Sequence, residues 1–93
     1  MFYVYFIESK KVNKIYVGFT EKNPFSRTEE HNKSSNDWTK SRKPFELIYY
    51  EEYVCKADAL RRENFYKMGF GRETKSLIVN YLKISNIKPK SSI

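Results

Sequence analysis

The alternation of hydrophobic and polar positions at the start of the chain predicts two β-strands joined by a short hairpin. Residues 2–7 are a run of aromatic and β-branched side chains, and in residues 14–20 apolar side chains alternate with tyrosine, glycine and threonine. Both patterns are typical of strands, and the short polar stretch between them favours an antiparallel connection. The register that we predict places Tyr5 opposite Tyr16, so that the two phenols lie side by side on one face of the sheet.

A helix, a loop and a third strand follow. Asn23 and Pro24 form a favourable helix start, as N-cap and first helical residue, and the helix continues to His31. Residues 32–44 are polar and are predicted to form a long loop, whereas residues 45–53 return to the strand pattern. Simple alternation in that strand places Ile48 and Tyr50 on the face opposite to Phe45, Leu47, Tyr49 and Tyr53.

Two helices and a basic tail are predicted after the third strand. Residues 56–68 have a helical pattern with Gly69 placed to end it, and residues 74–82 carry apolar positions at helical spacing. The tail, residues 83–93, is basic and serine-rich, and we expect it to fray. The order strand, strand, helix, strand, helix, helix predicts one α/β (α+β) domain over residues 1–82, with a three-stranded, mostly antiparallel sheet flanked by helices.

The composition fits one small basic domain. The chain has 93 residues, of which 40% are hydrophobic and 17% aromatic, so there is no room for a second domain. Its 18 Lys and Arg against 11 Asp and Glu give a net charge of +7, which favours an anionic partner, with nucleic acid as the leading class. Charge alone does not separate DNA from RNA or from an anionic membrane.

Cellular location is predicted from what the sequence lacks. A single cysteine, Cys55, excludes an intramolecular disulfide and a cysteine-based metal site, which fits a reducing compartment. The chain shows no basic leader and no apolar run near the ~18 residues of a membrane span. We therefore expect a cytoplasmic protein that does not bind membranes.

Five polar residues next to hydrophobic segments supply the chemistry of phosphodiester hydrolysis. They are two phenols, a permanent cation, an imidazole and a carboxylate, at Tyr5, Tyr16, Arg27, His31 and Glu63. These are the group types needed for hydrolysis with one divalent metal ion. Arg27 and His31 are four residues apart and share one helix face. Taken singly, each residue has an ordinary structural role, such as an ion pair between Glu63 and Lys67.

In order and spacing, these residues resemble the GIY-YIG nuclease family, specifically its small single-domain members. The chain is similar to the GIY-YIG domain of the bacterial nucleotide excision repair nuclease subunit, over residues 2–78. Val4-Tyr5-Phe6 matches the first tripeptide motif, without its usual glycine, and Tyr16-Val17-Gly18 matches the second. The later matching positions are Arg27, His31, the strand from Pro44 to Tyr49, Ala59, Arg62, Glu63 and Lys67.

The resemblance implies an endonuclease that depends on Mg²⁺ or Mn²⁺ and cuts DNA, with RNA not excluded. It implies Tyr16 as the phenol nearest the attacking water, Arg27 as the phosphate clamp and Glu63 as the only protein ligand of the metal, with Tyr5 and His31 completing the site. Nicking of branched or distorted DNA, as in DNA repair, is the expected reaction, because no sequence-reading domain fits in the chain. The alternative is a binding module with the same fold and no useful turnover. Either Tyr16 or His31 could accept the proton.

Further residues are candidates for contact with nucleic acid: Lys14, Gly18, Trp38, Lys40, Arg42, Lys43 and Lys67. Trp38 among three cations suits the stacking of a base, or it anchors the loop. Glycine weakens a strand unless something approaches closely, so we interpret Gly18 as room left for a phosphate.

Overall fold

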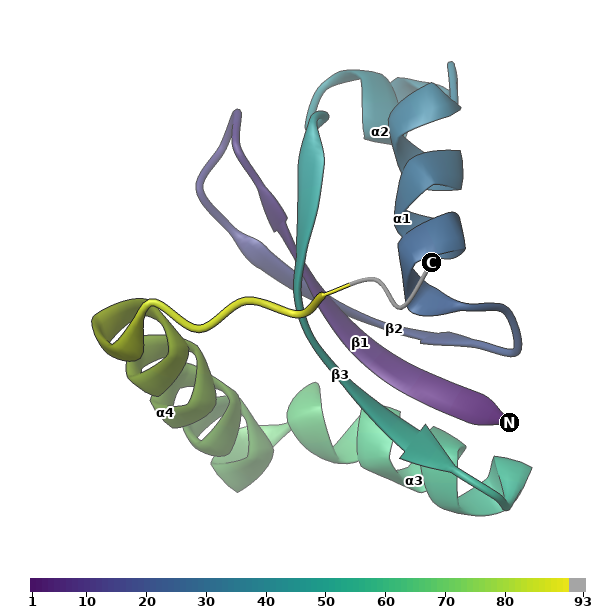
Figure 1. The fold of residues 1–93 in the computed structure, drawn as a ribbon, viewed down its shortest axis with the longest axis vertical. Coiled ribbons are helices and arrows are strands. Elements are labelled where there is room, and N and C mark those ends of the chain that lie inside the picture. The colour runs from purple at the N-terminus through teal and green to yellow at the C-terminus, as the bar shows by residue number, and fades with distance from the viewer. Residues whose placement is uncertain (91–93) are drawn as a thin grey trace.

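β1 is the central strand of a three-stranded antiparallel sheet in the order β2-β1-β3 (Figure 1). The structure, a computed structural model, describes residues 1–90. The strands are β1 Phe2–Ser9, β2 Ile15–Thr20 and β3 Phe45–Tyr53. The predicted fold class, α+β with a three-stranded antiparallel sheet flanked by helices, is confirmed. The element order β-β-α-α-β-α-α has one more helix than predicted.

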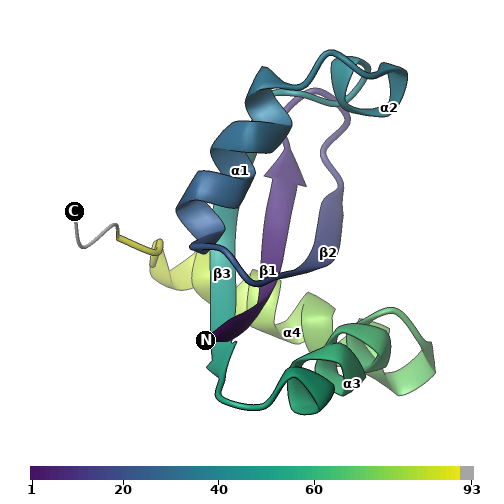
Figure 2. The ribbon, with the colours of Figure 1, turned by 90° about the vertical axis from the view of Figure 1, so that its right-hand side faces the viewer.

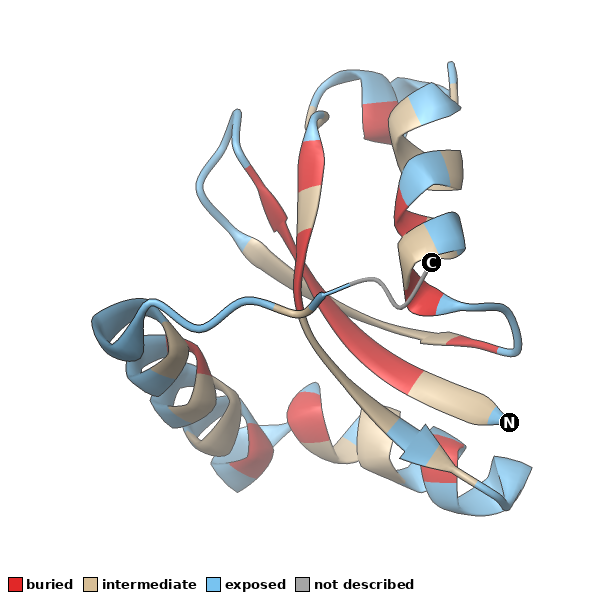
Figure 3. Ribbon diagram, in the orientation of Figure 1, coloured by how far each residue is buried: buried red, intermediate tan, exposed pale blue. Residues whose placement is uncertain are grey.

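Helices cover both faces of the sheet. Helix α1, Pro24–Lys33, lies along one face, and α3, Lys56–Tyr66, and α4, Gly69–Ser85, cover the other (Figure 2). Because successive strand residues point to opposite faces, β1 divides its side chains between two cores. Val4 and Phe6 pack with α3 and α4, while Tyr5 and Ile7 pack on the α1 side. Residues 4–9 of β1 are therefore all buried (Figure 3).

The hairpin register differs from the prediction by two residues. Tyr5 lies opposite Gly18, and Tyr16 lies opposite Ile7. The connection is longer than a tight turn, because the backbone closes through Ser9 and Lys14 and Asn13 adopts a φ of 56°. A shift of two residues keeps each side chain on its face. Tyr5 and Tyr16 thus share a face as predicted, although they are not direct neighbours across the strands.

A bulge in β3 overturns the simple alternation predicted there. Phe6 pairs with Tyr49, but the next residue of β1, Ile7, pairs with Leu47, so that Ile48 is the extra residue. Tyr49 therefore packs on the α3 side with Ile48, and Tyr50 packs on the α1 side. Tyr53 also packs on the α3 side, so the faces predicted for Tyr49, Tyr50 and Tyr53 relative to Phe45 and Leu47 were wrong.

The segment predicted as a loop is partly helical. Helix α1 continues to Lys33, and a one-turn helix, α2, spans Asp37–Lys40. The side chain of Asn36 caps α2 by accepting a hydrogen bond from the backbone N–H of Thr39 at 2.9 Å. Local capping thus organises a stretch whose composition alone indicated a loop.

The last two helices meet at a junction that the sequence analysis placed differently. Helix α3 ends at Tyr66, and Gly69 begins α4 instead of ending α3. Gly71 allows the close approach of the two helices, since a Cβ there would lie 1.6 Å from the carbonyl oxygen of Phe65. The predicted start of the last helix at residue 74 was therefore too late.

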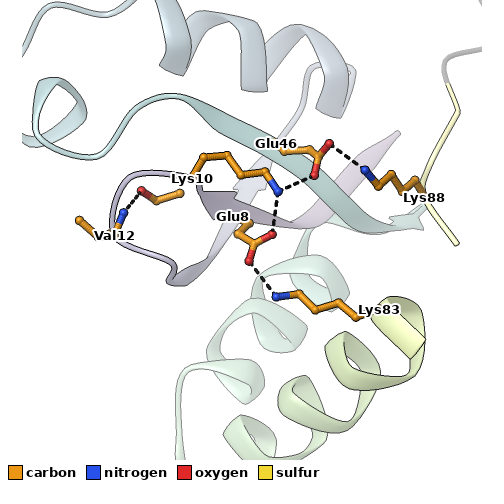
Figure 4. Close-up of polar contacts among 7 residues, drawn as sticks. Glu8, Lys10, Val12, Glu46, Lys83 and Lys88 are labelled. Atoms are coloured by element: carbon orange, nitrogen blue, oxygen red, sulfur yellow. Dashed lines mark hydrogen bonds and ion pairs between the residues drawn. The ribbon is translucent and has the colours of Figure 1, made fainter. Parts of the chain in front are cut away.

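The segment predicted to fray after residue 82 is held by ion pairs. Helix α4 runs to Ser85, and Lys83 contacts Glu8 at 2.8 Å (Figure 4). Lys88 contacts Glu46 at 3.3 Å, and Lys10 contacts the same carboxylate at 3.0 Å. The last part of the predicted tail, residues 91–93, lies outside the described residues. Within the described part of the chain, no helix has the length and apolarity needed to cross a membrane.

Candidate active site

A cavity of about 780 Å³ lies against the edge strand β2. On the α1 side of the sheet its lining includes Tyr5, Tyr16 and His31. On the other side the lining comes from the junction between α3 and α4, including Lys67. Three of the predicted site residues therefore face one hollow, which they reach from β1, β2 and α1.

Tyr5 is the buried centre of this group. The Tyr5 hydroxyl oxygen lies 3.2 Å from Nε2 of His31, and the residue is only 4% exposed. Burial raises the pKa of the Tyr5 phenol; Arg27 opposes that increase, and Glu63 adds to it. The Tyr5 oxygen is therefore within electrostatic reach of both the predicted cation and the predicted carboxylate.

His31 is neutral in this environment near pH 7. Burial lowers the pKa of its imidazole below the ordinary 6.5, and the positive charge of Arg27 lowers it further, whereas Glu30 opposes the decrease. A neutral ring can accept a hydrogen bond at Nε2 from the Tyr5 hydroxyl. Arg27, four residues earlier on α1, affects the pKa of both the Tyr5 phenol and the His31 imidazole, in keeping with the predicted shared helix face.

Gly18 leaves room for the Tyr5 ring, which corrects our interpretation of this residue. A Cβ built on Gly18 would lie 2.4 Å from both Cζ and the hydroxyl oxygen of Tyr5. The space above the glycine is thus filled by the protein's own phenol and is not open to a phosphate. A buried tyrosine directly across the strand pair requires a residue without a side chain.

The cation beside Tyr16 is Arg42. Nε of Arg42 donates a hydrogen bond to the Tyr16 hydroxyl oxygen at 3.1 Å. The guanidinium also lies 4.7 Å from the ring centre of Trp38 and donates from Nη1 to the Trp38 carbonyl oxygen at 2.9 Å. Since Arg42 donates to the Tyr16 oxygen, the hydroxyl proton of Tyr16 must point elsewhere.

Trp38 anchors the segment that carries Arg42. Its ring stacks on Phe45 with a centroid distance of 5.7 Å and an interplanar angle of 11°, and it meets Tyr16 edge-on at 5.1 Å. Of the two roles that the sequence left open, the anchoring role is the one that these contacts display. Lys43 donates to the carbonyl oxygen of Ser34 at 3.1 Å, and Lys40 is exposed.

Arg27 and Glu63 flank the cavity but are not part of its lining. Arg27 forms an ion pair with Glu30 at 3.0 Å, which raises the pKa of the guanidinium. Glu63 forms an ion pair with Lys67 at 3.0 Å, and its side chain is 18% exposed. The ordinary structural role considered for Glu63 is therefore present in the structure.

The donor set fits a single hard cation only in part. No group of three or more histidine, cysteine, aspartate or glutamate side chains converges on one point within residues 1–90. One carboxylate is nevertheless enough for Mg²⁺, which retains several waters and takes further oxygens from a substrate phosphate. Glu63 can supply that carboxylate if Lys67 moves away.

Comparison with known proteins decides the family. The GIY-YIG catalytic domain family matches residues 1–76. The chain belongs to the GIY-YIG family. Its fold is accordingly of the nuclease type, and the match covers the strands and helices that surround the cavity.

Relatives of similar size support this assignment to the GIY-YIG family. A "UPF0213 protein" of Pediococcus pentosaceus is 34% identical over 87 residues, covering 92% of this chain and 85% of that protein. One of Staphylococcus haemolyticus is 38% identical over 74 residues, covering 78% and 87%. One of Staphylococcus aureus is 36% identical over 62 residues, covering 66% and 73%. No solved structure matches the chain significantly.

Two cations of this GIY-YIG domain were missed by the sequence analysis. Arg72 and Lys75 line the cavity from α4. Arg72 lies before residue 74, where the predicted last helix began. The sequence analysis therefore did not place Arg72 and Lys75 on one helix face. Of the predicted nucleic-acid contacts, Lys14, Gly18, Trp38 and Lys67 line the cavity as well.

Proposed function

We propose that this GIY-YIG domain is a divalent-metal-dependent endonuclease that hydrolyses phosphodiester bonds in DNA and nicks branched or distorted substrates. The observation that carries the proposal is the convergence at Tyr5. Its hydroxyl is bonded to His31, and the charges of Arg27 and Glu63 both act on it. Helix α1 thus supplies an imidazole and a guanidinium, and α3 a carboxylate, that act on one buried phenol of β1.

Arg27 is assigned to the phosphate. Its guanidinium remains charged at any working pH, and its partner Glu30 is at the surface, so a phosphate can compete for it. A guanidinium can bind two oxygens of a phosphodiester at once and offset the charge that develops on them. Tyr5, whose ring is locked over Gly18, would hold the phosphate side of the site rigid.

Glu63 is assigned to the metal ion. A Mg²⁺ or Mn²⁺ ion held there would supply Lewis acidity for the phosphodiester. Within this chain, the ammonium of Lys67 occupies the carboxylate and would turn to solvent or to a DNA phosphate.

Tyr16 is the group that we assign to the attacking water. The Nε2 atom of His31 is engaged with Tyr5, whereas the Tyr16 hydroxyl faces the cavity and accepts from Arg42. Negative charge that develops on the Tyr16 oxygen during proton transfer would lie beside that guanidinium. His31 then acts by keeping Tyr5 in place.

The ion pair between Glu63 and Lys67 favours a second candidate function. A metal ligand that remains bound to a lysine gives a domain that binds nucleic acid without cutting it. This alternative predicts salt-sensitive DNA binding with no cleavage in any divalent metal.

The test is a nicking assay on supercoiled plasmid and on a branched duplex, with Mg²⁺ or Mn²⁺. Wild type is compared with Glu63→Gln, Arg27→Ala and Tyr16→Phe, and with Glu52→Gln as an exposed acidic control. We expect losses of roughly 10²- to 10³-fold in the first two variants and none in the control. Equal activity in all five proteins would indicate a contaminant and refute the proposal. Binding without cleavage by wild type would support the alternative.

A further inference from the structure

Helix α4 presents two cations to the cavity on the side opposite to Tyr5. Arg72 and Lys75 both line it and are three residues apart on the helix. This spacing places the two Cβ atoms roughly 5–6 Å apart on the helix surface. Both charged groups can therefore reach one small ligand between them.

Backbone oxygens hold both side chains in place. Nε of Arg72 donates to the carbonyl oxygen of Lys67 at 2.9 Å, which leaves the outer nitrogens of the guanidinium available. Nζ of Lys75 lies 3.4 Å from the carbonyl oxygen of Ile15, the residue before Tyr16 on β2. Lys75 is therefore fixed beside the strand that carries the proposed water-positioning phenol.

The pair is electrostatically unfavourable as it stands. Among residues 1–90 no carboxylate lies within ion-pair distance of either side chain, whereas Lys83 at the other end of α4 is paired with Glu8. Like charges at this helical spacing repel, and Arg72 lies in the first turn of α4, where the helix dipole disfavours cations. Burial lowers the pKa of Lys75, and Arg72 lowers it further. An anion would relieve both effects.

The surroundings are suited to an anion that belongs to a larger ligand. Among the described residues, the side chains of the lining that carry a charge near pH 7 are Lys14, Lys67, Arg72 and Lys75, all of them basic. The volume of about 780 Å³ is far larger than one phosphate requires and lies in the range that holds whole organic ligands. The cavity lies along β2, an edge strand of the sheet, so a polymer can enter and leave it from the side.

We propose that Arg72 and Lys75 together bind one backbone phosphate of the DNA strand, a different phosphate from the one that is cut. The identity of the ligand as DNA rests on the proposed function, but the site does not depend on cleavage. Its effect would be to fix the strand along β2, so that the phosphate to be cut stands between Tyr16 and Arg27.

The test is DNA binding without metal. A fluorescein-labelled branched duplex is titrated in EDTA with wild type, Arg72→Gln, Lys75→Gln and the double variant, and the fluorescence anisotropy is measured at several salt concentrations. Lys11→Gln, which removes an exposed charge of the hairpin outside the cavity, is the matched control. Lys75→Arg keeps the charge at the site.

Loss of one phosphate contact reduces the slope of log K against log salt by about 0.9 and weakens binding roughly five- to tenfold near 0.1 M salt. We expect this of each single glutamine variant and not of Lys11→Gln or Lys75→Arg. Because both side chains share one phosphate, the double variant should lose less than the product of the single losses.

Slopes that equal that of Lys11→Gln, multiplicative losses, or a wild type that does not bind would each overturn the inference. A wild type that binds as expected but does not cut would refute the proposed function alone.

Discussion

Glu51 on β3 and Glu63 on α3 are both largely buried carboxylates, with side chains 14% and 18% exposed, but their partners differ. Glu63 has one partner, Lys67, which is itself half exposed. Glu51 accepts four hydrogen bonds, from the hydroxyls of Tyr49 at 2.7 Å, Tyr53 at 2.5 Å and Tyr66, and from Nε of Arg62 at 3.2 Å.

The comparison shows that hydrogen-bond saturation, more than burial, distinguishes a structural carboxylate from a candidate ligand. An ionised carboxylate has about four acceptor positions, so the partners of Glu51 use them all. Burial raises the pKa of Glu51, but the phenols and Arg62 outweigh it and hold the pKa below 4.5. Burial, with the hydrogen bond to Glu51, raises the pKa of Tyr53 to about 12. Glu63 keeps acceptor positions for an ion.

The sharpest test of the comparison is the stability of the two glutamine variants. Glu51→Gln removes one of the two acceptor oxygens that receive hydrogen bonds from three phenols and Arg62, and it leaves Arg62 without a charge partner. We expect the free energy of unfolding to fall by about 3 kcal/mol. Glu63→Gln should change it by less than about 0.5 kcal/mol, since its one partner, Lys67, is half exposed and can be solvated by water instead. Urea unfolding followed by circular dichroism measures both.

A similar loss of stability in both variants would contradict the distinction between the two carboxylates. Glu52→Gln serves as the control, because Glu52 is the exposed neighbour of Glu51.

The closed Glu51 cluster also shows why only part of the fold could be predicted from sequence. Hydrophobic periodicity is a local signal, and it correctly predicted the hairpin, the third strand and the first helix. The effect of the bulge at Ile48 is not local, because it turns Tyr49 and Tyr53 away from the face of Phe45 and Leu47 and toward Tyr66. The hydroxyls of all three tyrosines there reach Glu51. The sequence shows no glycine or proline at this point that would indicate a bulge.

Candidate site residues were predictable where motif spacing reflects local geometry. Arg27 and His31 share a helix face, and the structure brings both to Tyr5. The contact between Arg42 and Tyr16 joins residues 26 apart, and that between Lys75 and Ile15 joins residues 60 apart. Such contacts depend on how the loop and α4 pack, which no local pattern specifies.

A second test asks how tightly the other cluster, around Tyr5, is packed. Gly18→Ala would place a methyl group 2.4 Å from the Tyr5 ring, so the ring must move away. We expect a loss of about 2 kcal/mol in stability, as for other overpacked sites. The hydrogen bond between Tyr5 and His31 should be lost with it, which the imidazole signals in NMR spectra would report. Unchanged His31 signals would show that the site tolerates movement of the phenol.

Substitution of Arg42 tests whether the residues at the cavity, Tyr5, Tyr16 and His31, are organised for chemistry or only for binding. Arg42→Gln removes the cation beside Tyr16, and we expect the single-turnover cleavage rate to fall about tenfold, equivalent to about 1.4 kcal/mol, with little change in the Kd for DNA. Arg42→Lys should recover part of the rate. If instead Kd rises and the rate is unchanged, Arg42 contacts phosphate, as its sequence context suggested. Lys40→Gln, an exposed cation nearby, is the control.

The smallest expected effect is a change of the free energy of unfolding with pH near neutrality. His31 at the cavity contributes it, and the Glu51 cluster does not. Burial and Arg27 lower the pKa of His31 in the folded state below the 6.5 of the unfolded chain. Between the lowered pKa and 6.5, the unfolded chain therefore binds more protons than the folded one. Stability contributed by the neutral imidazole is therefore complete above pH 6.5 and is lost as the pH falls through the lowered value. The groups that act on it are Tyr5, Arg27 and Glu30.

His31→Gln cannot titrate, so its free energy of unfolding should decline less than that of wild type between pH 7 and 5. The Glu51 cluster cannot produce this difference, because the pKa of Glu51 lies below 4.5 and those of its phenols are raised above 10. Parallel stability curves for the two proteins would mean that folding leaves the pKa of His31 unchanged, as expected of a solvated imidazole. In that case His31 would be accessible to a water in the cavity and would return as a candidate base.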